Sequence, residues 1–143
     1  MNKKYIIAAI AILIIICAGT FAFTNSSSNA STSIDANALE DRGNLIVDSE
    51  SLDESKGLYH TDSADVNTIL VKNGGALKLI DSIINKTGDT ASTGDNADFY
   101  GINSAILVNT NGTLDISNVE INTDSKGSNG IFVTNAEASG EDS

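Results

Sequence analysis

The sequence contains very few of the residues on which covalent cross-links and many catalytic sites depend. Its 143 residues include one cysteine and one histidine, and they include no proline and no tryptophan. A single cysteine excludes an internal disulfide. A single histidine excludes a histidine-rich zinc site and leaves little room for a histidine-based catalytic triad. We therefore expect a chain that is stabilised by packing.

Basic residues are also scarce. Eight Lys and Arg residues stand against 19 Asp and Glu residues, and the formal net charge is −11 at pH 7. A protein that binds nucleic acid through its phosphates needs a basic surface, which this composition does not supply. Nucleic acid is therefore not an expected partner.

The N-terminus carries the clearest single signal. Lys3 and Lys4 precede residues 5–23, which contain no charged residue. Lysines before an apolar stretch hold the N-terminus in the cytoplasm and direct the following chain across the membrane. A helix of this length extends roughly 28 Å, close to the thickness of a bilayer core. We predict that residues 1–23 are a signal peptide or an uncleaved transmembrane signal anchor, and that 5–23 contact the membrane. The rest would be exported to the cell surface, either membrane-anchored or secreted.

The exported part divides by composition into three segments. Residues 24–43 begin with a run of small polar residues, which is typical of a flexible tether. Residues 44–136 contain short apolar segments separated by Asn and Gly. Residues 137–143 form an acidic tail.

The segment 44–136 contains an internal repeat. Residues 69–79 align with 106–116 at a constant offset of 37 without a gap. Residues 131–135 begin a further copy, in which Ile131 aligns with Ile106, and residues 45–47 form an earlier copy, in which Leu45 aligns with Ile69. Repeats of about 20 to 50 residues are typical of solenoids, in which each unit packs on its neighbours.

The repeats have the pattern of short strands. Leu114-Asp115-Ile116 alternates apolar and polar residues, and Gly-Gly and Asn-Gly pairs at 74–75 and 111–112 favour sharp turns. We predict an all-β fold, a right-handed parallel β-helix of three to four coils. Asn85 would lie over Asn122 in an amide ladder at a turn. The expected core stack places Leu77, Leu79 and Ile84 on Leu114, Ile116 and Ile121.

The same residues support a family resemblance. The strings that carry it are ILVKNGG (69–75), INKTGD (84–89), DFYGINSA (98–105), INT (121–123) and GSNGIF (127–132). They resemble the start of the right-handed, pectate-lyase-like β-helix domain in adhesin-like surface proteins of anaerobic bacteria and methanogenic archaea. The resemblance covers residues 44–136. It implies a surface stalk or carbohydrate-binding module and brings no catalytic residues.

Some β-helix proteins are polysaccharide lyases or hydrolases, and this is the alternative function. Asn122-Thr123-Asp124 resembles the first short motif of polygalacturonase-like hydrolases, which use several aspartates as acid and base. The other motifs of that family have no counterpart, and His60 lies between Tyr59 and Thr61 where the family has glycines. We therefore interpret residues 122–124 as a turn and His60 as a surface or packing residue.

The repeat that runs from 69 to 106 is longer than the repeat that runs from 106 to 131, and we assign the excess to a loop at 87–103. One interpretation is a ligand site in which carboxylates bind sugar hydroxyls or Ca²⁺ and an aromatic ring stacks on a sugar. The other, which we favour, is that the aromatic residues pack the loop onto the coil while the aspartates face water. No other cofactor is expected. The candidate ligand-binding residues are Asp89, Asp95, Asp98, Phe99 and Tyr100.

Residues 131–133 open a new coil shortly before the sequence ends. Solenoids require caps, so we expect either that the acidic tail covers the last coil or that the chain is the N-terminal piece of a longer protein. We favour the second. Together these features predict a non-enzymatic, adhesin-like cell-surface protein or fragment that binds carbohydrate or another cell.

Overall fold

The computed structural model describes residues 33–92 and 94–135. Within these two ranges, no helix is long and apolar enough to cross a membrane. The predicted signal or anchor at 1–23, part of the predicted tether and the acidic tail at 137–143 lie outside the described residues.

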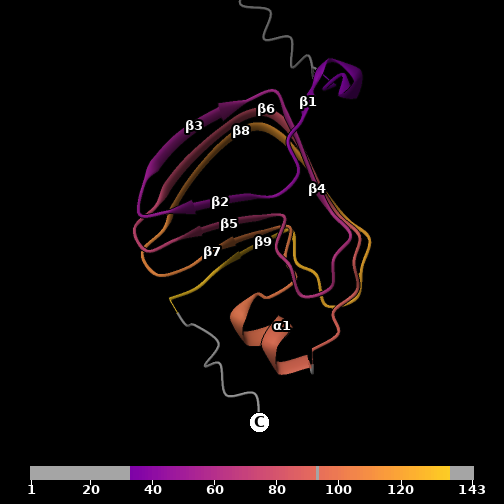
Figure 1. Ribbon diagram of the computed structural model, residues 1–143, viewed down its shortest axis with the longest axis vertical. Helices are drawn as coiled ribbons and strands as arrows, with labels where there is room; N and C mark the ends of the chain where they lie inside the picture. The colour runs from indigo at the N-terminus through magenta and orange to yellow at the C-terminus, as the bar shows by residue number, and fades with distance from the viewer. Residues whose placement is uncertain (1–32, 93, 136–143) are drawn as a thin grey trace, which may run out of the picture. The chain divides into compact units, whose positions relative to one another are not determined.

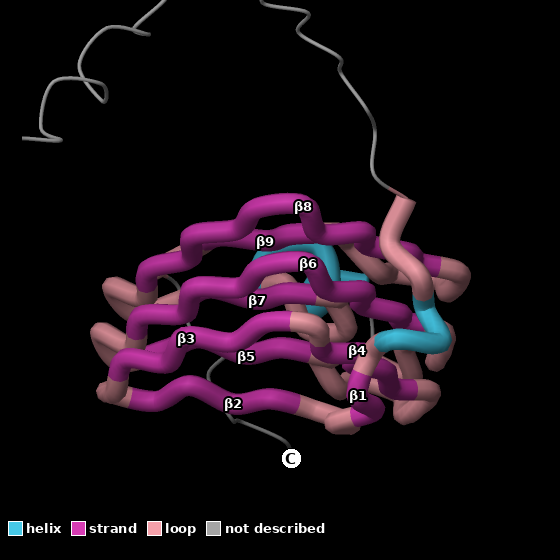
Figure 2. Tube along the Cα trace, turned by 90° about the horizontal axis from the view of Figure 1, so that it is seen from above, coloured by secondary structure: helices cyan, strands magenta, loops and turns pink. Residues whose placement is uncertain are grey.

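The fold is all-β and consists of two parallel sheets (Figures 1 and 2). Sheet A contains β1, β3, β4, β6 and β8, and sheet B contains β2, β5, β7 and β9. In sheet A the bounds are Glu40–Asp41, Ser51–Ser55, Gly57–Thr61, Ala76–Lys86 and Thr113–Thr123. In sheet B they are Leu45–Asp48, Ile69–Lys72, Ile106–Val108 and Ile131–Val133. The described helices are a 3-10 turn, η1 (Ala36–Ala38), and α1 (Gly94–Tyr100).

The chain passes alternately through the two sheets, and each passage adds a strand beside the strand of the previous passage (Figure 1). In sheet B the register joins Leu45 to Ile69, Ile69 to Ile106 and Ile106 to Ile131. These pairs confirm the alignment of the repeats that the sequence predicts. In sheet A, β6 and β8 pair at the offset of 37 and bring together the three predicted core pairs, Leu77 with Leu114, Leu79 with Ile116 and Ile84 with Ile121.

Alternation within the strands determines the core. In β6, Leu77, Leu79 and Ile84 are buried, whereas Lys78 between the first two is exposed. Sheet B contributes to the same apolar cluster through Val47, Ile69, Val71, Ile106 and Val108. The core therefore consists of the inward-facing side chains of both sheets.

Sheet A bends at one position in three successive passages. Lys56, Asp81 and Asn118 occupy this position with φ values of +55°, +51° and +50°. Lys56 separates β3 from β4, and these two strands pair with the first and second parts of β6. At each passage, a residue in the left-handed backbone conformation bends the strand, so that the sheet curves around the core (Figure 1).

The predicted amide ladder is present, but it does not lie at a turn. The Asn122 side-chain amide donates a 3.0 Å hydrogen bond to Oδ1 of Asn85. Both residues lie inside paired strands. Asn122 and Thr123 are the last residues of β8, so the prediction that residues 122–124 form a turn is wrong for these two. Their position follows from the register, which extends β8 to match the full length of β6.

Two further predictions need correction. Residues 40–41, assigned to the flexible tether, form β1 and pair with β4, so part of the predicted tether belongs to the folded domain. The excess of the longer repeat does lie between β6 and β7, because 87–105 connects these strands whereas 62–68 and 124–130 form the corresponding connections. It is not only a loop, however, because it contains α1.

The two ends of the strand stack differ. At the N-terminal end, Arg42 forms an ion pair with Glu54, which occupies the inward position that Leu79 and Ile116 hold in later passages. At the other end, Ile116 is 38% exposed although its partner Leu79 is fully buried. Among the described residues, no strand pairs with the second edge of β8 or β9, and this leaves their inward side chains partly open.

Candidate functional site

We define the insertion as residues 87–105, which contain all five predicted ligand-binding residues. Asp95, Asp98 and Phe99 are spaced i, i+3 and i+4 along α1 and therefore share one face of the helix. All three are exposed, and Phe99 is 66% exposed. Ala97, by contrast, is buried and lies beside Gly127 in the connection after β8. The helix thus buries a small residue and presents an aromatic ring and two carboxylates on one exposed face.

The other two predicted residues lie apart from this face. Tyr100 is half-buried at the end of α1. Asp89 precedes the helix, and its Oδ1 accepts a 2.8 Å hydrogen bond from the main-chain N–H of Lys126. The structure therefore brings together three of the five residues. Within residues 33–92 and 94–135, no three His, Cys, Asp or Glu side chains gather as a potential metal site.

The packing interpretation is correct for the aspartates and wrong for Phe99. Asp89, Asp95 and Asp98 are exposed to solvent, as expected. Phe99 does not pack the insertion onto the sheets, because most of its surface is exposed. The insertion is instead held by Phe132 of β9, whose ring lies against Gly101, and by buried polar groups. Figure 1 shows α1 beside sheet B, on the side away from sheet A.

Asn103 is the most connected of these buried groups. It is fully buried and has a φ of +73°. Its side-chain amide donates hydrogen bonds to the main-chain oxygens of Gly88 at 2.9 Å and Lys126 at 3.2 Å. Its Oδ1 accepts a 3.0 Å bond from the N–H of Asp65. One side chain therefore joins the three successive connections 62–68, 87–105 and 124–130.

Asp65 fixes the segment that leads into α1. One carboxylate oxygen accepts hydrogen bonds from the Thr90 hydroxyl at 2.7 Å and from the N–H groups of Ala91 and Ser92 at 3.2 Å each. These bonds, chiefly the one from Thr90, lower the pKa of Asp65 below its ordinary value. The charged carboxylate thus organises the loop.

Lys86 ends β6 with a fully buried side chain. Its ammonium group donates to the main-chain oxygens of Ser63 at 3.1 Å and Gly88 at 2.6 Å. Burial lowers the pKa of Lys86, and the nearby carboxylates, Asp65 foremost, act in the opposite direction. The group anchors the start of the insertion through carbonyl oxygens.

Asp65, Lys86 and Asn103 are not among the functional residues predicted from the sequence. A signal for Lys86 was present, because strand alternation places it at an inward position after Ser82 and Ile84, where a charged side chain requires buried partners. Asp65 and Asn103 lie in connections, and their partners are distant in the sequence. Such contacts leave no pattern in the sequence.

The other candidate motifs occupy the surface. His60 is exposed, as predicted, and its Nε2 lies 3.1 Å from Oδ1 of Asp41, which is also exposed. Asp124 is exposed, and its N–H donates to the main-chain oxygen of Lys86 as part of the connection after β8. Neither places an acid and a base side by side in a cleft.

Comparisons of the chain with protein-family models, with curated proteins and with solved structures gave no match. The resemblance to adhesin-like β-helix proteins therefore stays a prediction.

Proposed function

We propose that the chain is a non-enzymatic cell-surface protein, built as a right-handed parallel β-helix, that displays a binding face for carbohydrate on another cell or in its surroundings. Three successive parallel registers, from Leu45 through Ile69 and Ile106 to Ile131, support the β-helix. Residues 5–23 would tether the domain to the membrane. The chain then resembles adhesin-like surface proteins in architecture and in use.

The exposed face of α1 is the observation that carries the proposed function. Phe99, which is 66% exposed, presents an apolar aromatic surface to solvent, and aromatic residues are common at binding surfaces. Phe99 can stack on the apolar face of a sugar ring, while Asp95 and Asp98 on the same helix face can accept hydrogen bonds from hydroxyls. The bonds of Asp65, Lys86 and Asn103 hold the segments on both sides of this helix. A rigid support of this kind reduces the entropy lost on binding.

Binding of the full-length chain, kept in detergent, to an array of immobilised polysaccharides tests this proposal. Phe99→Ala should abolish retention on the glycans that bind the parent protein. The matched control is Ile46→Ala, which removes an aliphatic side chain that is 60% exposed on sheet B. It should leave binding unchanged. Equal retention of both variants would contradict a binding role for α1.

Tyr100→Ala separates recognition from packing at the end of α1. A loss of glycan binding at an unchanged melting temperature would assign Tyr100 to the binding face. A lowered melting temperature would assign it to the support of the helix. Incubation of the same protein with polygalacturonate tests the enzymatic alternative, because the appearance of new reducing ends or unsaturated products would overturn the proposed function.

A further inference from the structure

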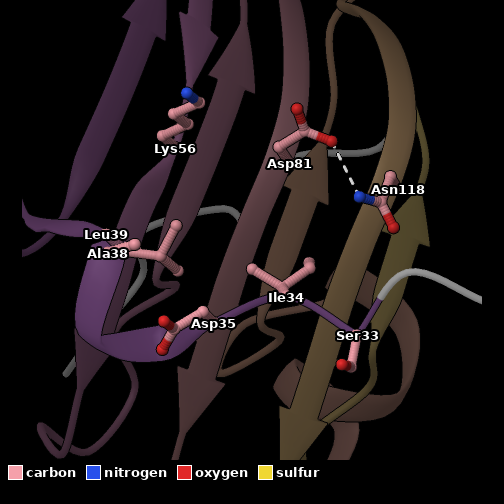
Figure 3. A pocket seen from close by; sticks show the side chains of 8 residues that line it. All are labelled: Ser33, Ile34, Asp35, Ala38, Leu39, Lys56, Asp81 and Asn118. Atoms are coloured by element: carbon pink, nitrogen blue, oxygen red, sulfur yellow. Dashed lines mark hydrogen bonds between the residues drawn. The ribbon is translucent and has the colours of Figure 1, made fainter.

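A groove of about 410 Å³ lies at the bend of sheet A (Figure 3). One wall consists of Lys56, Asp81 and Asn118, the three residues at the bend that have positive φ values in successive passages through sheet A. Residues 33–39 cross the sheet at this level and form the other wall. The groove is lined by none of the residues of α1.

The first wall is polar and ordered. The Asn118 side-chain amide donates a 2.7 Å hydrogen bond to Oδ1 of Asp81, and Figure 3 shows the two side chains turned toward each other. Within the described part of the chain, Oδ2 of Asp81 and Oδ1 of Asn118 accept no hydrogen bond, and the Lys56 ammonium forms no ion pair. The wall therefore offers two acceptors and a cationic donor.

The second wall is mainly apolar and is held in shape. Asp35 caps η1, because its Oδ1 accepts hydrogen bonds from the N–H of Asn37 at 3.0 Å and from the Asn37 side-chain amide at 3.2 Å. The Asp35 carboxylate is therefore already hydrogen-bonded within η1. Ile34 and Leu39, both half-buried, provide the apolar lining of the groove.

The lining determines the chemical class of the ligand. Because the Asp35 carboxylate is already hydrogen-bonded to Asn37, the charges that face the groove are those of Asp81 and Lys56, which balance and therefore favour neither an anion nor a cation. A groove of this volume falls within the range of about 300–1,000 Å³ that is usual for small-molecule sites. We propose that it binds an uncharged sugar of one or two rings. Ring carbons would contact Ile34 and Leu39, and hydroxyls would bond to Lys56, Asp81 and Asn118.

The spacing of the polar wall suits such a ligand. Lys56 and Asn118 lie on the passages on either side of Asp81, two strand spacings or about 9.6 Å apart, so their side chains can reach hydroxyls on opposite sides of a six-membered ring. The combination of hydroxyls on the edge of a ring and an apolar face is characteristic of sugars. This site is separate from α1, so the proposal does not depend on binding by α1.

Saturation-transfer NMR on the full-length chain, in a detergent without a sugar headgroup, tests the groove. The probes are D-glucose, D-galactose, N-acetylglucosamine and their uncharged β-linked disaccharides. Asp81→Asn retains a residue type that tolerates a left-handed conformation and removes the charge. It should weaken the binding of the recognised sugar at least tenfold. Asp115→Asn, on an exposed position of β8 in the same sheet, is the matched control and should change the affinity less than twofold.

Ala38→Trp provides a second test, because Ala38 is exposed in η1 and a large ring there should fill the groove. It should abolish saturation transfer. The absence of transfer from every probe to the parent protein would overturn the proposal. Undiminished transfer in both Asp81→Asn and Ala38→Trp would also overturn it. Loss of transfer in Phe99→Ala alone would place sugar binding on α1 and would overturn the proposal while supporting the proposed function.

Discussion

The main-chain N–H of Asp65 donates a 3.0 Å hydrogen bond to the side-chain oxygen of Asn103, 38 positions later in the sequence. The amide of the same Asn103 side chain donates to the main-chain oxygens of Gly88 and Lys126. Parallel strand pairing alone would leave the irregular connections between the sheets without such bonds. A fully buried asparagine supplies them and so ties the insertion to the connections on both sides.

Asn103→Ala should strongly destabilise the domain. It leaves the oxygens of Gly88 and Lys126 without this donor and places alanine at a φ of +73°, which only Gly, Asn and Asp adopt readily. We expect a loss of about 2–4 kcal/mol in the free energy of unfolding. Urea unfolding followed by circular dichroism measures it. Asn122→Ala, which removes an exposed ladder bond, should cost less than about 0.5 kcal/mol. Similar costs for the two variants would contradict the bridging role of Asn103.

Gly88→Ala should also be severe, for a steric reason. A Cβ atom at Gly88 would clash with the main-chain oxygen of Asp62, so one backbone segment must move. We expect a cost of about 3 kcal/mol or more. Gly74→Ala is the contrast, because Gly74 has a φ of +76° but nothing within 4 Å of a Cβ. Its cost should be about 1–2 kcal/mol, from backbone strain alone. Thermal melts of the two variants compare them, and a smaller loss for Gly88→Ala would show that the connections are loosely packed.

The strand pairing could be predicted because similar strings recur in the sequence at offsets that equal the offsets between paired strands. Ile69-Leu70-Val71 and Ile106-Leu107-Val108 are the same string, and the glycines that follow mark the same turn. Stacked passages place like residues on like residues, so an offset in sequence becomes a pairing in space. The length of the insertion follows from the same alignment.

The structure of the insertion could not be predicted in this way. α1 has seven residues, of which Ala97 is buried, and this is too short to show helical periodicity. β1 has two residues and forms only because β4 presents an edge beside it. The positions of Asp65 and Asn103 depend on contacts between connections that have no repeat relation. The repeated part of the chain was therefore predictable, and its single interruption was not.

Leu79→Ala and Ile116→Ala test the difference between the interior and the open end of the stack. The two residues are register partners in β6 and β8, but Leu79 is fully buried and Ile116 is 38% exposed. Leu79→Ala should cost about 2–4 kcal/mol through lost transfer energy and a cavity, and Ile116→Ala about 1 kcal/mol. Denaturant titrations of the full-length chain measure both. Equal costs would show that the end beyond β8 is covered in solution.

Acid should weaken the domain partly through Asp65. The hydrogen bond from Thr90 and the bonds from Ala91 and Ser92 hold the pKa of Asp65 below its ordinary value of 3.8. A carboxyl group whose folded pKa is depressed adds stability above its unfolded pKa, and this contribution disappears as the pH falls through the folded pKa. Asp65→Asn keeps a residue that tolerates a φ of +59° and removes the charge. The variant should therefore be less stable than the parent at about pH 6.5, and the gap should narrow below about pH 3.8.

Urea midpoints of the parent, Asp65→Asn and Thr90→Val at a series of pH values measure this gap. Asp48, whose pKa is also lowered, chiefly by the hydrogen bond from Asn73, contributes equally to all three proteins and cancels in the comparison. Thr90→Val removes the largest single cause of the Asp65 shift, so its profile should lie between the other two. A gap between the parent and Asp65→Asn that stays constant from about pH 6.5 to pH 3 would mean that Asp65 acts through its shape and neutral hydrogen bonds, because a contribution from its charge must fall as the carboxyl group takes up a proton.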